Sequence, residues 1–303
     1  MFFWSVFTHV LLPILVMVGF GWLIDRRSRL DLGSLVKLNI YLFVPAFIFV
    51  HVVDSNLSGA AAARIMGFTA CIIASMFVLS ALVGRCLHYE AGHTRALQLA
   101  TMFYNSGNYG IPLMALAYPT MGPLLQVFIV LTQNISTFTV GLALAASTHR
   151  SGWRLALPML RQVSLWAVLS AFTVRLFHLP VQEVRWLWVP LQYLSEALVA
   201  FALITLGVQL SQTKARQSLS RLGWALGLRL LVGPLIATAL VPVFGFKGQE
   251  ATIMIVSSSF PTAVNTALIA HEFQADSQFA AAVVFYSTLF SMLTVTLLIA
   301  FLR

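Results

Sequence analysis

Hydrophobic residues fill most of the chain in long stretches that short polar segments separate. A helix needs about 20 predominantly apolar residues to cross a bilayer. Arg161 and Arg175 lie in one of these stretches, where long basic side chains can reach opposite membrane interfaces. The pattern predicts an all-α polytopic membrane protein with ten transmembrane helices. They are expected at residues 5–24, 34–53, 66–84, 96–117, 122–147, 157–178, 187–210, 222–244, 250–270 and 278–302.

Two of the expected spans contain residues that interrupt helices. The fourth span carries YNSGNYGIP at residues 104–112, and the ninth carries SSSFPTAVN at residues 257–265. Glycine and proline free backbone N–H and C=O groups that lipid cannot satisfy, so such breaks face protein or a water-filled cavity. Paired broken helices in two halves of a chain mark the binding site of many secondary transporters. We therefore predict that broken helices 4 and 9 cross near the membrane midplane and enclose a substrate site.

The position of the two breaks predicts an internal repeat. Pro112 and Pro261 lie 149 residues apart, so the breaks fall in the fourth helix of each half. Ten spans divide into two sets of five, and because five is odd, two similar halves have opposite orientations in the membrane. We expect two inverted five-helix repeats, at residues 1–150 and 151–303. The scaffold and transport domains would each be drawn from both halves.

Composition and charge narrow the class of protein. Hydrophobic residues make up 59% of the chain and charged residues only 9%, which excludes an ordinary soluble domain. The net charge of +9 comes from Lys and Arg residues in loops, so it does not indicate nucleic-acid binding. Twelve of the basic residues lie in one set of alternate loops and five in the other, which predicts both termini outside. Two cysteines provide no disulfide or metal framework, and we expect no cofactor.

The breaks also supply the candidate binding residues. Helix N-termini favour anions, so free N–H groups after Gly110 and after Ser259 would favour a carboxylate between them. Asn105 and Asn108 can bind that carboxylate or cap a half-helix, and Asn265 can face the same cavity or hydrogen-bond another helix. The predicted substrate-binding set is Asn105, Asn108, Gly110, Pro112, Ser259, Pro261 and Asn265.

Two charged residues lie inside predicted spans. Glu196 is the one carboxylate well inside a span, where it could carry a proton or lie near the outer interface. Arg229 could pair with Glu196, attract anions, or extend to the cytoplasmic interface. We treat both as candidate coupling or charge residues.

Several motifs resemble one transporter family. Asn105, Gly110 and Pro112, spaced N-x4-G-x-P and followed by Leu113, resemble the fourth helix of the auxin efflux carrier family, which includes plant PIN-type and bacterial organic-acid carriers. Other segments similar to that family are YLFVPAFIF at 41–49, LG at 206–207, FP at 260–261, AHEF at 270–273 and STLFS at 287–291. Two features depart from the family. The long central loop of the plant carriers is absent, and Ala263 stands where the family often has glycine.

The resemblance implies a fold, a mechanism and partners. It implies a ten-helix inverted repeat shared with bile-acid sodium symporter-like proteins, elevator-type movement of organic anions, substrate contact at Asn105, and a homodimer formed through the scaffold. The leading hypothesis is a carrier of auxin-like or dicarboxylic acids in a bacterial inner membrane, coupled to protons or to the membrane potential. A sodium-coupled symporter is the alternative, with Gln126, Gln133 and Asn134 as candidate polar groups. Motifs of membrane-embedded enzymes are missing, and a channel remains a third class.

Overall fold

The computed structural model describes residues 2–141, 143–144, 162–213, 219–272 and 275–302. Within these ranges the regular structure is helical, apart from one isolated antiparallel bridge between Tyr104 and Thr262. The prediction of an all-helical membrane protein is confirmed. Seven described helices are long and apolar enough to cross a membrane: Trp4–Ser28, Leu32–Val53, Gly59–Cys86, Gly122–Gly141, Arg185–Gln212, Arg221–Val243 and Ser277–Leu302.

The elements follow one another with short connections. The first half contains α1 (Phe2–Val6), η1 (Phe7–Leu11), α2 (Leu12–Ser28), α3 (Leu32–Leu38), η2 (Asn39–Phe43), α4 (Val44–Val53), α5 (Gly59–Cys86), α6 (Ala91–Met102), η3 (Ser106–Gly110), α7 (Ile111–Ala117), α8 (Gly122–Ser136) and η4 (Thr137–Gly141). The second half contains α11 (Val163–Leu176), η6 (Val181–Glu183), α12 (Arg185–Gln212), α13 (Leu219–Gly227), η7 (Leu228–Val232), α14 (Gly233–Val243), α15 (Gly248–Ser257), α16 (Val264–Glu272) and α17 (Ser277–Leu302).

Two of the ten predicted spans are interrupted helices in the described part of the chain. The helix is interrupted inside 96–117 and inside 250–270, as the glycines and prolines there predict. In the predicted span 157–178, the structure describes α11 from Val163 to Leu176. The predicted boundary between residues 150 and 151 lies outside the described residues.

Four π-helical turns lie immediately before prolines. Proline lacks an N–H, and its ring clashes with the carbonyl four residues earlier, so a helix must adjust there. In η1, η2 and η7 the adjustment is a wider turn, in which the residue before the proline donates its N–H five residues back. The prolines concerned are Pro13, Pro45, Pro112 and Pro234. Asn39, Asn108 and Arg229 lie in these turns.

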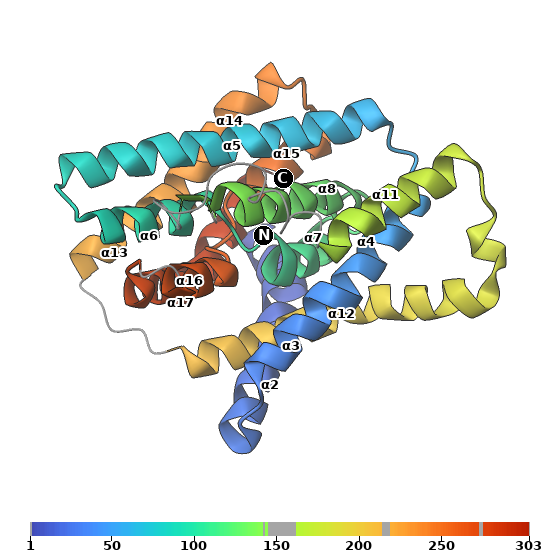
Figure 1. The fold of residues 1–303 in the computed structure, drawn as a ribbon, viewed down its shortest axis with the longest axis horizontal. Helices are drawn as coiled ribbons and strands as arrows, with labels where there is room; N and C mark the ends of the chain where they lie inside the picture. The colour runs from blue at the N-terminus through green and yellow to red at the C-terminus, as the bar shows by residue number, and fades with distance from the viewer. Residues whose placement is uncertain (1, 142, 145–161, 214–218, 273–274, 303) are drawn as a thin grey trace.

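The helices pack in two groups. In the first group α12 packs against α2 and α4, and α11 packs against α4 (Figure 1). Gly21 and Gly207 allow a close approach there, because a Cβ at these positions would lie 2.1 Å from the Ile204 oxygen and 2.0 Å from the Val18 oxygen. In the second group α5 packs against α6 and α8, and α17 packs against α6, α13 and α16. The interrupted helices belong to the second group.

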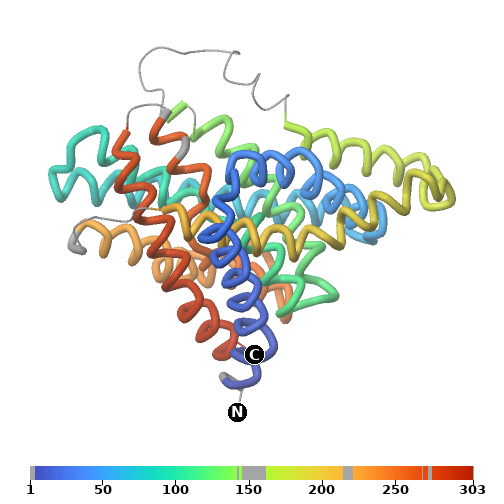
Figure 2. The backbone as a smooth tube through the Cα atoms, turned by 90° about the horizontal axis from the view of Figure 1, so that it is seen from below, coloured from blue at the N-terminus to red at the C-terminus, as the bar shows by residue number. Residues whose placement is uncertain are grey.

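Both chain ends lie at the same end of the molecule. The N-terminal helix and α17 run side by side to that end (Figure 2), and α1 contacts α17.

Candidate functional site

The two helix breaks are hydrogen-bonded to each other. Asn105 donates its backbone N–H to the Pro261 oxygen at 2.7 Å, and Ala263 donates to the Phe103 oxygen at 2.9 Å. These bonds flank the bridge between Tyr104 and Thr262, so the breaks form a short antiparallel pair. The pairing satisfies backbone groups that the breaks remove from their helices. The predicted contact between the two breaks is therefore present.

The helices that follow the two breaks, here called the half-helices, begin at other residues than the sequence suggested. Asn105 is the N-cap of η3, which continues into α7, and the second half-helix begins at Val264. The Gly110 N–H bonds to the Asn105 oxygen, and the Ile111 N–H that follows bonds to the Gly107 oxygen. The Ser259 N–H bonds to the Val256 oxygen, and the Phe260 N–H that follows bonds to the Ser257 oxygen. The prediction of free N–H groups after Gly110 and Ser259 was wrong, because π-helical and turn hydrogen bonds use them. First-turn N–H groups instead follow Asn105 and start at Val264.

Both helix N-termini open onto one cavity of about 80 Å³. One buried water needs roughly 10–15 Å³, so this space admits a small organic molecule. The lining residues are polar without charge or apolar: Val36, Asn39, Ile40, Val44, Tyr104, Asn105, Ser106, Gly107, Asn108, Val130, Gln133, Asn134, Thr137, Phe138, Gln162, Ser164, Ala263, Val264 and Asn265. Among the described residues, no acidic or basic side chain lines this cavity. Recognition of an anion here would depend on N–H groups and helix dipoles.

Three of the seven predicted substrate-binding residues line this cavity. They are Asn105, Asn108 and Asn265. Gly110, Pro112, Ser259 and Pro261 are buried beside it and shape the breaks.

Gly110 and Pro261 illustrate how the buried residues beside the cavity shape the breaks. A Cβ on Gly110 would lie 2.6 Å from both the Phe260 ring and the Gln126 Nε2 atom. The Pro261 carbonyl accepts the hydrogen bond from Asn105. These residues bring the two breaks into contact, and the asparagines face the space that results.

Asn105 both caps a helix and faces the cavity. Its Oδ1 accepts the Tyr109 N–H at 3.4 Å, which is the capping role. Its Nδ2 is buried and has no hydrogen-bond partner among the described residues. The capping role and the binding role are therefore compatible, because the amide oxygen makes the cap and the amide nitrogen of the same cavity-lining residue stays unpaired.

Asn39 was missed by sequence reasoning, although it lines the same cavity. It is 2% exposed and donates from Nδ2 to the Asn108 Oδ1 atom. This bond joins η2 of the first packing group to η3 of the second. Asn39 and Asn108 both lie in π-helical turns that precede prolines, Pro45 and Pro112, but at different distances from the proline, so the sequence offers no shared spacing that would have found Asn39.

Gln126 connects the two broken helices behind the cavity. Its Nε2 donates to the Ser106 oxygen at 2.7 Å, and its Oε1 accepts from the Ser257 hydroxyl at 3.2 Å. The side chain is completely buried. One amide therefore fixes the start of η3 relative to the end of α15.

Arg229 lies at the C-terminal ends of α6 and α15, the two helices that precede the breaks. Its guanidinium is completely buried and donates to the Thr101 oxygen at 2.6 Å and to the Ser258 oxygen. It also lies 4.9 Å from the centre of the Tyr104 ring. Thr101 and Ser258 are at the C-termini of α6 and α15, which carry partial negative charge. Arg229 therefore neutralises both C-termini and neither pairs with Glu196 nor extends to an interface.

Glu196 lies away from the cavity. Its side chain is on an exposed face of α12. The cavity lining within the described residues does not include it. The pairing of Glu196 with Arg229 that the sequence suggested is absent.

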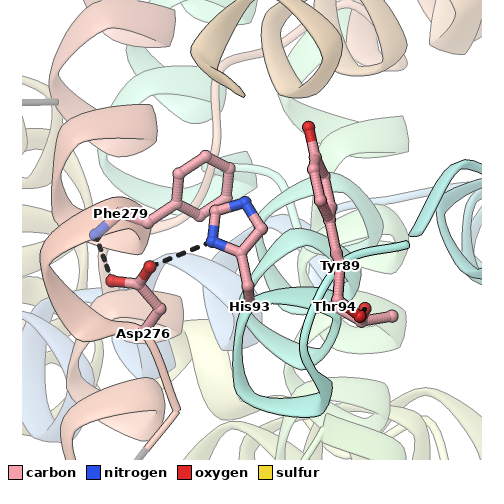
Figure 3. A network of polar contacts seen from close by, with 5 residues as sticks. All are labelled: Tyr89, His93, Thr94, Asp276 and Phe279. Carbon is pink, nitrogen blue, oxygen red and sulfur yellow. Dashed lines mark hydrogen bonds and ion pairs between the residues drawn. The ribbon is translucent and has the colours of Figure 1, made fainter. Parts of the chain in front are cut away.

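A buried histidine forms a second polar cluster far along α6 from the break. His93 Nδ1 lies 2.9 Å from Asp276 Oδ2, and Asp276 Oδ1 accepts the Phe279 N–H at 3.0 Å. Figure 3 shows the imidazole between the rings of Tyr89 and Phe279. Asp276 thus caps α17 while it binds His93, which fastens the N-terminal end of α6 to the last helix.

Comparison with known proteins gives one family and several relatives. A family model described as "Membrane transport protein" matches residues 6–156 and 157–299. The chain is 26% identical to an uncharacterized transporter of Methanothermobacter thermautotrophicus, over 96% of each chain. It is 26% identical to an uncharacterized transporter of Methanocaldococcus jannaschii, over 94% of each. A Rhizobium meliloti protein named "Putative malonate transporter" is 24% identical over 98% of this chain and 96% of its own length.

Proposed function

Because the chain belongs to the membrane transport protein family, we propose that it is a secondary transporter of small organic anions. The observation that carries the proposal is the convergence of two helix N-termini on one uncharged cavity, with Asn105 and Asn265 beside them. Such termini stabilise a carboxylate without requiring a basic side chain. Broken helices that flank a central site are a recurrent arrangement in secondary transporters.

The two packing groups support an elevator-type mechanism of alternating access. We assign α2, α4, α11 and α12 to a scaffold domain, and the interrupted helices with α5, α8 and α17 to a transport domain. The Asn39–Asn108 hydrogen bond joins the two groups at the cavity. Sliding of one group past the other would therefore break this bond and replace it with another. In this proposal the two groups derive from two inverted five-helix repeats.

The size of the cavity favours short carboxylic acids. A space of about 80 Å³ suits a molecule with few carbon atoms better than an indole or bile acid. The name of the Rhizobium relative points the same way, since malonate is a short dicarboxylic acid. We place auxin-like acids second among the candidate substrates.

Coupling to the membrane potential is favoured over coupling to sodium. In many transporters the C-terminal ends and unwound carbonyls of broken helices hold the sodium ion. Here the Arg229 guanidinium already binds the Thr101 and Ser258 carbonyl oxygens. A second cation at the same oxygens would be repelled by that charge. The sodium symporter is therefore the alternative function, and proton coupling remains compatible with the proposal.

The proposal also includes the membrane, the orientation of the termini and the oligomeric state. The distribution of basic residues supports both termini outside, in a bacterial inner membrane. The common end of the two termini in Figure 2 agrees with that arrangement. The family resemblance supports a homodimer formed through the scaffold domain.

Charge movement in proteoliposomes on a solid-supported membrane tests the function. Malonate, malate, indole-3-acetate and a bile acid would be applied with and without sodium, at two pH values. We expect saturable, sodium-independent currents with a short carboxylate, and their loss in Asn105→Ala. Counterflow of labelled acids detects electroneutral exchange. Absence of both current and counterflow for every carboxylate would contradict the proposal.

A further inference from the structure

Three residues that line the cavity carry buried amide groups with unpaired hydrogen-bond acceptors as well as donors. Three lining residues, each at most 6% exposed, have side-chain polar atoms without a hydrogen-bond partner among the described residues. The unpaired donors are Asn105 Nδ2 and Gln133 Nε2, and the unpaired acceptors are Asn39 Oδ1 and Gln133 Oε1. A buried polar atom without a partner is costly, so a molecule that binds here is favoured when it satisfies both kinds.

A simple carboxylate satisfies only the donors. Its oxygens accept hydrogen bonds from Asn105 Nδ2 and from first-turn N–H groups of the half-helices. It offers no hydrogen to Asn39 Oδ1 or Gln133 Oε1, and its negative charge faces the partial negative charge of those oxygens. A ligand with acceptors alone would leave two buried oxygens unpaired.

The two acceptors come from different packing groups. Asn39 lies in η2 of the first packing group, and its Nδ2 is already used by Asn108. Gln133 lies in α8 of the second group. An amide side chain presents one acceptor group and one donor group, whichever way it is turned. Charged side chains in place of these amides would not offer both kinds of group to a ligand. A ligand that spans the cavity meets acceptors from both groups.

We propose that the cavity selects carboxylates that also carry a hydrogen-bond donor, with Asn39 and Gln133 as specificity-determining residues. Hydroxy acids meet this description, and so does a dicarboxylate that keeps one proton. The carboxylate lies toward the half-helix N-termini, and the donor lies toward Asn39 and Gln133. The inference rests on the proposed transport of small organic anions and narrows its substrate class.

Matched pairs of acids test this selectivity. Lactate and propionate differ by one hydroxyl group, as do malate and succinate. Uptake of each labelled acid would be measured with the full-length protein in proteoliposomes. We expect kcat/KM to be higher for the hydroxylated member of each pair by about tenfold or more, because a site built around a hydroxyl rejects the analogue that lacks it.

Shape-preserving variants separate recognition from packing. Asn39→Leu and Gln133→Met remove the acceptors at nearly constant side-chain volume. We expect each variant to reduce the ratio of lactate to propionate kcat/KM several-fold, whatever its effect on the absolute rate of propionate uptake. Gln98→Met is the matched control, because Gln98 is buried in α6 and does not line the cavity. It should keep the wild-type ratio. Apparent melting temperatures in detergent would confirm that each variant is folded.

The outcomes distinguish the inference from the function on which it rests. Equal kcat/KM for both members of each pair in the wild type would overturn the inference and leave anion transport standing. An unchanged ratio in both Asn39→Leu and Gln133→Met would overturn the assignment to these residues. Failure to transport any of the four acids, together with no ligand-induced thermal shift, would contradict the proposed function and the inference together.

Discussion

The backbone N–H of Asn105 donates to the carbonyl oxygen of Pro261 at 2.7 Å, although 156 positions separate the two residues in the chain. This bond makes the two helix breaks one structural unit. A change in either break therefore alters the position of both helix N-termini at the cavity. The following expectations concern residues on each side of this unit.

The two roles of Asn105 can be separated by substitution. Asn105→Ala removes both the cap and the donor, and should cost about 1 kcal/mol of stability as well as anion transport. Asn105→Asp keeps an oxygen for the Tyr109 N–H but places negative charge at the cavity, so it should retain stability and lose transport of anions. Initial uptake rates and apparent melting temperatures would be compared for the two variants. Wild-type uptake by Asn105→Asp would limit this residue to its capping role.

Gly107 and Gly110 should differ sharply in how well they tolerate substitution by alanine. An alanine Cβ at Gly110 would meet the Phe260 ring and Gln126 at 2.6 Å, whereas a Cβ at Gly107 would meet nothing within 4 Å. We expect Gly110→Ala to destabilise the protein by about 1–3 kcal/mol, as overpacking of a core does, and to reduce uptake. Gly107→Ala is the control and should fold normally. Equal melting temperatures for both variants would show that the breaks are not tightly packed at Gly110.

Glu196 tests the proton-coupling hypothesis that the sequence suggested. Its side chain is exposed on α12 and does not line the cavity. Glu196→Gln should therefore leave both the rate of uptake and its pH dependence unchanged. A pH profile measured between acidic and neutral values would check this expectation. If uptake by the variant lost its pH dependence, Glu196 would be a coupling residue that acts from the exposed face of α12.

Apolar run lengths and helix breakers predicted the all-helical class, the seven long apolar helices and the two interruptions, while the inverted repeat stays a prediction. Long apolar stretches predicted the continuous helices, and glycine and proline near residues 110 and 261 predicted the interruptions. These signals are local, because the membrane requires each helix to satisfy its own backbone. The exact start of each half-helix was predicted incorrectly. It depends on turn hydrogen bonds such as that from Gly110 to Asn105, which composition alone does not reveal.

The candidate site was predictable only in part. Asn105, Asn108 and Asn265 were found because they lie in or beside the breaks. Asn39 lies 69 positions from its partner Asn108, inside an ordinary apolar stretch, and no local signal of charge or periodicity singles it out. The environment of Arg229 was also not predictable, since its two carbonyl partners come from the ends of two other helices. Long-range contacts of this kind follow from packing.

Arg229 provides the test of sodium independence. Its guanidinium binds the carbonyl oxygens of Thr101 and Ser258, so wild-type uptake should be the same in sodium and in choline buffer. Arg229→Met leaves two buried carbonyls without charged donors, each worth about 1–3 kcal/mol, and should strongly lower the melting temperature. Arg221→Met is the control, because Arg221 is exposed on α13 and should change stability by less than about 0.5 kcal/mol. A saturable dependence of wild-type uptake on sodium would instead favour the symporter, since a sodium ion would then have to bind at oxygens other than these two.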